Sequence, residues 1–144
     1  MVSKIKDYEF QTQCVEVLIE KTVETTSKQV ITVKAPTGAG KTIILIKYVD
    51  EFLKNTAGNT AFVWLCPGKG NLEEQSKARM EEVTPHIDTR NLMYSMMAGF
   101  EPGSVTFINW ELVTKRGNTA LKDSERSNLF EKIAEAHKDG TEFV

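Results

Sequence analysis

Apolar and polar positions alternate along the chain in patterns that change between helical and strand periodicity. Apolar side chains at helical spacing predict an amphipathic helix over residues 7–22, with Asp7 as its N-terminal cap. Short apolar runs predict strands over residues 30–34, 61–66 and 104–108, and weaker strand signals cover residues 90–94 and 142–144. Helical patterns follow the first two strands, ending near residues 55 and 84, and a last helix is expected over residues 124–138.

The same order of elements occurs twice in the first half of the chain. A strand ends in a Gly-containing turn, and a helix begins directly after it, at Lys41 in the first copy and after Asn71 in the second. Asn71 and Glu74 have the spacing of a capping box, in which two side chains bond free N–H groups at a helix start. Because the strands are short and apolar, helices are expected on both faces of a parallel sheet. The sequence therefore predicts a doubly wound α/β fold.

Length and composition are those of one globular domain. The 144 residues are 40% hydrophobic and 26% charged, with a formal net charge of -2. The chain thus lacks the basic surplus that marks many nucleic-acid-binding proteins, and any such contact must come from local groups. No apolar run reaches the roughly 18 residues of a membrane span, and the first residues lack a secretory signal. A soluble cytoplasmic chain without membrane contact is expected.

Sulfur-containing side chains are expected inside this domain. Cys14 and Cys66 lie in apolar segments without metal-ligand spacing, which predicts reduced and buried thiols. Met93, Met96 and Met97 are expected to fill the core. These residues are assigned no chemical function.

The strongest chemical signal is Ala-Pro-Thr-Gly-Ala-Gly-Lys-Thr at residues 35–42, between a predicted strand and a predicted helix. That context is typical of a phosphate-binding loop, whose backbone N–H groups and helix dipole favour an anion. Lys41 would place its charge on the outer phosphates and Thr42 would hold Mg²⁺, so these two are the catalytic candidates. The candidate nucleotide-binding residues are Thr37, Gly38, Ala39, Gly40, Lys41 and Thr42. A nucleoside triphosphate is therefore the expected ligand.

The strict loop pattern begins with Gly, whereas this chain has Ala35. The variant resembles motif I of superfamily 2 helicases and translocases, which usually reads Ala-x-Thr-Gly-x-Gly-Lys-Thr. With Phe-Ile-Asn-Trp-Glu at residues 107–111, the chain is similar to the start of the restriction subunit of type III restriction-modification enzymes. The resemblance implies a RecA-like P-loop NTPase in which residues 1–144 form the N-terminal part of a single helicase domain. It also implies ATP and Mg²⁺ as cofactors, and ATP hydrolysis coupled to translocation on DNA in the parent enzyme.

Phe10-Gln11 resembles the aromatic-Gln pair that precedes motif I in many superfamily 2 proteins. There the Gln reads the adenine edge, and Gln11 has the donor and the acceptor that this task requires. The Arg often found just before this pair in the family has no match here. The alternative is an ordinary aromatic residue and its polar neighbour on an amphipathic helix.

Two later turns correspond, in the resemblance, to motifs that contact the nucleic-acid backbone. The turn after the second predicted strand contains Lys69 and Gly70, which could hold a phosphate together with free N–H groups of the following helix. Asn109 and Trp110 follow the third predicted strand, where they could bond a phosphate or sugar and stack on a base. The alternatives are a capped turn with a solvated lysine, and a tryptophan buried under a helix.

The resemblance also implies parts that these residues do not supply. Motif II, an Asp-Glu pair at the end of a strand, has no match, since Asp50-Glu51 lies within a predicted helix. The second RecA-like domain with its arginine finger and the nuclease domain are also missing, so negligible ATP hydrolysis is expected from these residues alone. A sheet incomplete at its C-terminal end is expected to expose an edge and favour self-association. The other expected partners are DNA, the C-terminal helicase domain and a modification subunit.

Two other functions remain open from the residues alone. A small nucleotide kinase would use Lys41 on the transferring phosphate, but it would need an arginine-rich lid, and the arginines at positions 79, 90, 116 and 126 are scattered. A non-catalytic domain could instead bind a nucleotide, or a partner chain through the open sheet edge. Of the three functions, only the translocase is expected to bind both ATP and single-stranded DNA.

Overall fold

The computed structural model describes residues 8–24, 28–56, 58–111 and 123–144. Contacts along the chain group it into two compact units, Met1–Thr56 and Ala57–Val144. The predicted cap at Asp7 lies outside the described residues. In the described ranges, each helix is too short or too polar to cross a membrane.

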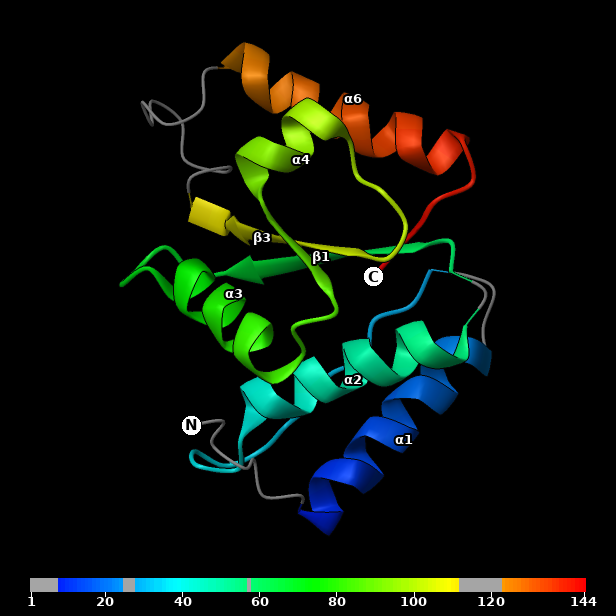
Figure 1. The fold of residues 1–144 in the computed structure, drawn as a ribbon, viewed down its shortest axis with the longest axis vertical. Coiled ribbons are helices and arrows are strands. Elements are labelled where there is room, and N and C mark those ends of the chain that lie inside the picture. Colours follow the sequence, from blue (N-terminus) through cyan, green and yellow to red (C-terminus); the bar gives the residue numbers. More distant parts are fainter. Residues whose placement is uncertain (1–7, 25–27, 57, 112–122) are drawn as a thin grey trace. The chain divides into compact units, whose positions relative to one another are not determined.

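The first unit contains two helices that pack against each other (Figure 1). α1 spans Glu9–Glu24 and α2 spans Lys41–Asn55. Both helices form where the sequence shows apolar side chains at helical spacing, and the inward-facing members of that pattern, such as Leu18, are buried. A polar contact also joins the helices, because the hydroxyl oxygens of Thr22 and Tyr48 lie 2.8 Å apart.

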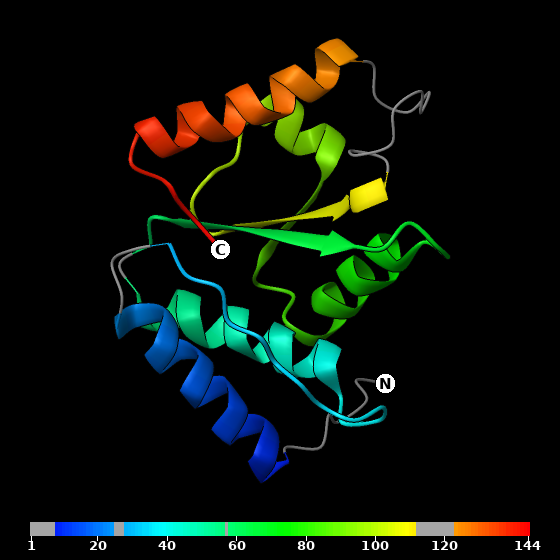
Figure 2. The same cartoon turned by 180° about the vertical axis from the view of Figure 1, so that it is seen from behind.

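The predicted strand over residues 30–34 is wrong. Residues 28–36 have no regular secondary structure and belong to no strand of the sheet. They form the long connection from α1 to α2 (Figure 2), and Val30 within it is 89% exposed. β-branched side chains favour an extended backbone, but a strand also requires hydrogen bonds and side-chain contacts with a neighbouring strand. In the described ranges this segment has no such neighbour.

The second unit is built on a four-stranded parallel sheet in the order β2-β3-β1-β4. The strands are β1 (Thr60–Cys66), β2 (Asp88–Asn91), β3 (Ser104–Asn109) and β4 (Glu142–Phe143). β3 is buried along almost its whole length, as expected for a strand of a parallel sheet that is covered on both faces. The strands predicted over residues 61–66, 104–108 and 142–144 are thereby confirmed.

Helices cover both faces of this sheet, as Figure 1 shows. They are α3 (Leu72–Val83), α4 (Leu92–Ala98) and α6 (Asp123–Lys138). On the face of α3, the Cys66 thiol lies 3.8 Å from the Ser76 hydroxyl. On the opposite face, Ser95 of α4 shares a 2.7 Å hydrogen bond with Thr106, and Leu129 of α6 packs in the core. The doubly wound α/β fold predicted from the sequence is therefore confirmed.

Three local details differ from the sequence prediction. The sequence predicts a strand over residues 90–94, but β2 ends at Asn91 and residues 92–94 belong to α4. Met93 and Met97 lie on the outer side of this helix, 74% and 82% exposed, instead of filling the core. The capping box at Asn71 is also wrong, because Asn71 has a left-handed backbone and no side chain caps α3.

Candidate functional site: a phosphate loop and two strand-end turns

The segment 35–42 forms a tight turn that leads directly into α2. The N–H of Ala39 donates to the carbonyl of Pro36 over 3.2 Å and closes the turn. Gly38 and Gly40 have φ values of 87° and 78°, a left-handed backbone that side chains with a Cβ rarely adopt. The two glycines therefore allow the chain to reverse its direction over a few residues just before the helix starts.

The N-terminus of α2 is open to a ligand. Gly40 occupies the N-cap position, and no side chain caps the helix. At this end of the helix, the N–H of Ile44 donates to the carbonyl of Gly40 over 2.9 Å. The leading N–H groups thus face outward at the positive end of a helix dipole, the arrangement that attracts phosphate. Lys41 and Thr42 are exposed on this first turn.

Gln11 reaches the loop from α1 and is only 4% exposed. Its side-chain Nε2 donates to the carbonyl of Ala39 over 3.0 Å. Its Oε1 accepts a hydrogen bond from the Lys47 ammonium over 3.4 Å. Sequence reasoning placed Gln11 near the nucleotide but missed Lys47, whose partner lies 36 residues away along the chain.

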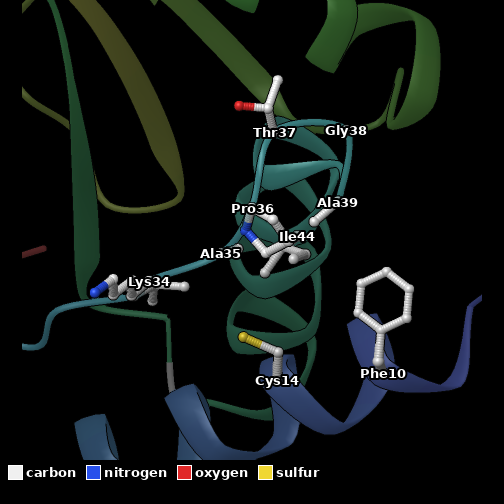
Figure 3. Close-up of a pocket in the computed structure, with 10 residues that line it drawn as sticks. Phe10, Cys14, Lys34, Ala35, Pro36, Thr37, Gly38, Ala39 and Ile44 are labelled. Atoms are coloured by element: carbon white, nitrogen blue, oxygen red, sulfur yellow. The ribbon is translucent and has the colours of Figure 1, made fainter.

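A cavity of about 560 Å³ lies beside the loop within the first unit. Figure 3 shows Phe10 and Cys14 reaching it from α1, with Ala35 and Pro36 of the loop and Ile44 of α2 around it. This volume falls within the range of small-molecule sites, roughly 300–1,000 Å³. The mostly apolar lining suits a planar ring system better than a charged group.

The residues present fit a magnesium ion held mainly through a nucleotide. Thr42 offers a hydroxyl oxygen beside the open helix start, and Mg²⁺ prefers oxygen ligands shared between protein and phosphate. Over the described ranges, no group of three or more His, Cys, Asp and Glu side chains could hold a metal alone. Asp50 lies in the interior of α2, where it pairs with Lys54 over 3.0 Å.

Residues 4–138 match the model of a protein family described as type III restriction enzyme, res subunit. The chain belongs to this family. The match covers almost the entire sequence, and it confirms the resemblance that the loop motif and residues 107–111 indicated. No curated protein and no solved structure matches the chain significantly. Membership places the chain with the N-terminal domains of superfamily 2 helicases, which have the RecA-like P-loop fold.

The second unit of this res-subunit domain presents two turns at one edge of its sheet. β1 and β3 run parallel, with Cys66 in register with Asn109. The turn at residues 67–70 and the segment beginning at Asn109 therefore leave the sheet at the same edge, although some forty residues separate them. Lys69 and Gly70 are exposed on the first turn, and Trp110 is 47% exposed on the second. The alternative of a Trp110 side chain buried under a helix is thus wrong.

The local geometry of these turns favours a phosphate at one position, near Lys69, and opposes one at another, beside Gly68. Gly70 and Asn71 both have positive φ, and α3 begins without a side-chain cap, so its first N–H groups are open. Gln75 instead donates from its side chain to the carbonyl of Gly70 over 3.1 Å. Glu111 packs directly against Gly68, and its carboxylate would repel a phosphate at that point of the turn. A phosphate would therefore fit best near Lys69.

Proposed function

We infer that the chain is the ATP-binding part of an ATP-dependent DNA translocase of the type III restriction kind. The single observation that carries this proposal is the open N-terminus of α2, preceded by two left-handed glycines and carrying Lys41 and Thr42 on its first turn. The family match supports an ATP-dependent, helicase-like protein, and such proteins generally use ATP and Mg²⁺. Residues 1–144 would then be the N-terminal part of the first RecA-like helicase domain.

In this proposal the loop acts mainly by position and charge. The backbone N–H groups at the open start of α2 face the phosphates, with those of Thr37, Gly38 and Gly40 beside them, while the N–H of Ala39 closes the turn. Lys41 neutralises the outer phosphate oxygens. The Thr42 hydroxyl would hold Mg²⁺, and the ion would offset the charge of the phosphates. The cavity beside Phe10 and Cys14 offers room for the base.

The strand-end turns of the second unit would contact DNA. Lys69 and Gly70 would hold a backbone phosphate at the start of α3, and Asn109 and Trp110 would bond and stack on the neighbouring nucleotide. Coupling of hydrolysis to movement would require the C-terminal helicase domain, and restriction would require a modification subunit. We propose a cytoplasmic location, as suits an enzyme that acts on DNA.

Calorimetric titration with ATP and Mg²⁺ tests this function, with Lys41→Ala as the key variant. Loss of a charge-assisted contact to phosphate should weaken binding by at least about tenfold. Lys54→Ala is the matched control, because Lys54 lies on the same helix and is exposed, with partners Asp50 and Glu51. Equal affinity of the wild type and Lys41→Ala would contradict the proposal. Titration with single-stranded DNA, comparing the wild type with Lys69→Ala, tests the proposed contact between the strand-end turns and DNA.

A further inference from the structure

The amide of Gln11 joins two partners of opposite hydrogen-bonding character. The carbonyl of Ala39 can only accept a hydrogen bond, and the Lys47 ammonium can only donate one. These partners therefore fix the orientation of the amide, with Nε2 toward the loop at 3.0 Å and Oε1 toward α2 at 3.4 Å. A carboxylate could satisfy Lys47 but not Ala39, and an apolar side chain could satisfy neither. Only an amide at this position matches both groups.

The backbone of the loop is shaped to admit this amide. A Cβ built on Gly40 would lie 2.6 Å from Gln11 Nε2, which is far inside ordinary van der Waals contact. Gly38, the other left-handed glycine of the loop, has no atom within 4 Å of such a Cβ. The glycine at position 40 therefore serves two requirements, its positive φ and the space that the Gln11 side chain occupies.

Burial separates this role from base recognition. Gln11 is 4% exposed, whereas its neighbour Phe10 on the same helix is 50% exposed. A base beside α1 would thus meet the Phe10 ring and find little of the Gln11 amide surface. In this structure the hydrogen bonds of Gln11 are directed to the protein itself.

We propose that Gln11 is a positioning residue that holds the phosphate loop in its binding conformation, through the Ala39 carbonyl, and does not read the base. The proposal rests on the function proposed above, because it concerns the same loop. It deepens that function in one respect: Gln11 would support the binding of any triphosphate, whatever base it carries. The base would then be selected by other groups.

The test compares ligands that share phosphates and differ in the base. Gln11→Met removes the amide at nearly constant volume, and Gln13→Met is the matched control, since Gln13 is an exposed glutamine of the same helix. Affinities of wild type and variants are measured for ATP, GTP, CTP and inorganic tripolyphosphate with Mg²⁺. We expect Gln11→Met to weaken all four ligands by a similar factor, about tenfold, as for a lost hydrogen bond to a buried group. Gln13→Met should leave them unchanged.

Gln11→Glu sharpens the comparison. It retains the acceptor for Lys47 but turns an oxygen toward the Ala39 carbonyl, so we expect a loss at least as large as that of Gln11→Met. A loss confined to ATP would overturn the proposal and assign Gln11 to the base. No loss in either variant, or an equal loss in Gln13→Met, would overturn it as well.

A second measurement does not depend on nucleotide binding. Hydrogen exchange of the Ala39 and Ile44 amides, both bonded within the loop region, should be faster in Gln11→Met than in Gln13→Met at equal thermal stability. Unchanged exchange would overturn the positioning role. If the wild type bound no triphosphate, the function proposed above would fail, while the exchange rates would still decide whether Gln11 positions the loop.

Discussion

Substitution of Gly68 by alanine offers a direct test of how the two strand-end turns meet. A Cβ at Gly68 would lie 2.5 Å from the carboxyl carbon of Glu111 and 2.6 Å from its Cβ, against an ordinary contact distance of at least 3.4 Å. The carboxyl end can swing aside, but the Glu111 Cβ is fixed to the backbone. The backbone at one of the turns must therefore move by about 0.8 Å. Overpacking of this kind costs about 1–3 kcal/mol.

That cost corresponds to a drop of about 3–10 °C in Tm for a domain of this size. Thermal unfolding followed by circular dichroism measures it, with Lys69→Ala as a control in the same turn. Because the clash involves Glu111 Cβ, Gly68→Ala should be rescued by Glu111→Gly and less well by Glu111→Ala. If Gly68→Ala melted with the wild type, or if Glu111→Gly gave no rescue, the contact between these turns would be refuted.

Three further predictions follow from the described contacts. Burial raises the pKa of Tyr48, and its hydrogen bond to Thr22 has a smaller, opposing effect. The free energy of unfolding that this burial contributes should therefore be fully present below pH 10.0 and decrease above it. Tyr48→Phe should remove this decrease in unfolding curves measured at alkaline pH. Arg90 donates hydrogen bonds to Asp88, Glu101 and the carbonyl of Gly99. Because both carboxylates are more than half exposed, Arg90→Met should lower the free energy of unfolding, measured in urea, by only about 2 kcal/mol. Arg79→Met, which removes an exposed pair with Glu82, should cost less. Phosphate release from ATP by these 144 residues should match that of Lys41→Ala, because the sequence holds no strand-end Asp-Glu pair; faster release by the wild type would show that other groups complete the site.

Much of the fold could be predicted because its elements carry their own local signals. β1 is a nearly continuous apolar run, β3 is rich in β-branched and aromatic side chains, and turns bound both strands. α2 begins where the Gly-Lys-Thr sequence indicated. The error at residues 30–34 has a different origin. The β-branched residues of Val-Ile-Thr-Val favour an extended backbone, but pairing depends on a second strand that the local sequence cannot specify.

Short elements and long-range contacts were less predictable for the same reason. α4 has seven residues, too few for helical periodicity to stand out, and its apolar Met93 and Met97 are exposed. In the candidate site, the turn of the loop could be predicted from its glycines, because a glycine acts on the backbone at its own position. The bonds of Gln11 to Ala39 and Lys47 join residues 28 and 36 positions apart, and no spacing rule relates such positions.

The unpaired segment 28–36 also makes the chain cleavable at a defined place. Proteases bind exposed backbone that lies outside helices and strands, and this segment has no regular secondary structure, with Lys28 and Lys34 exposed near its two ends. Lys34 also lines the cavity beside the phosphate loop. Trypsin would thus report on the loop without any label: a bound nucleotide should slow cleavage after Lys34 more than cleavage after Lys28.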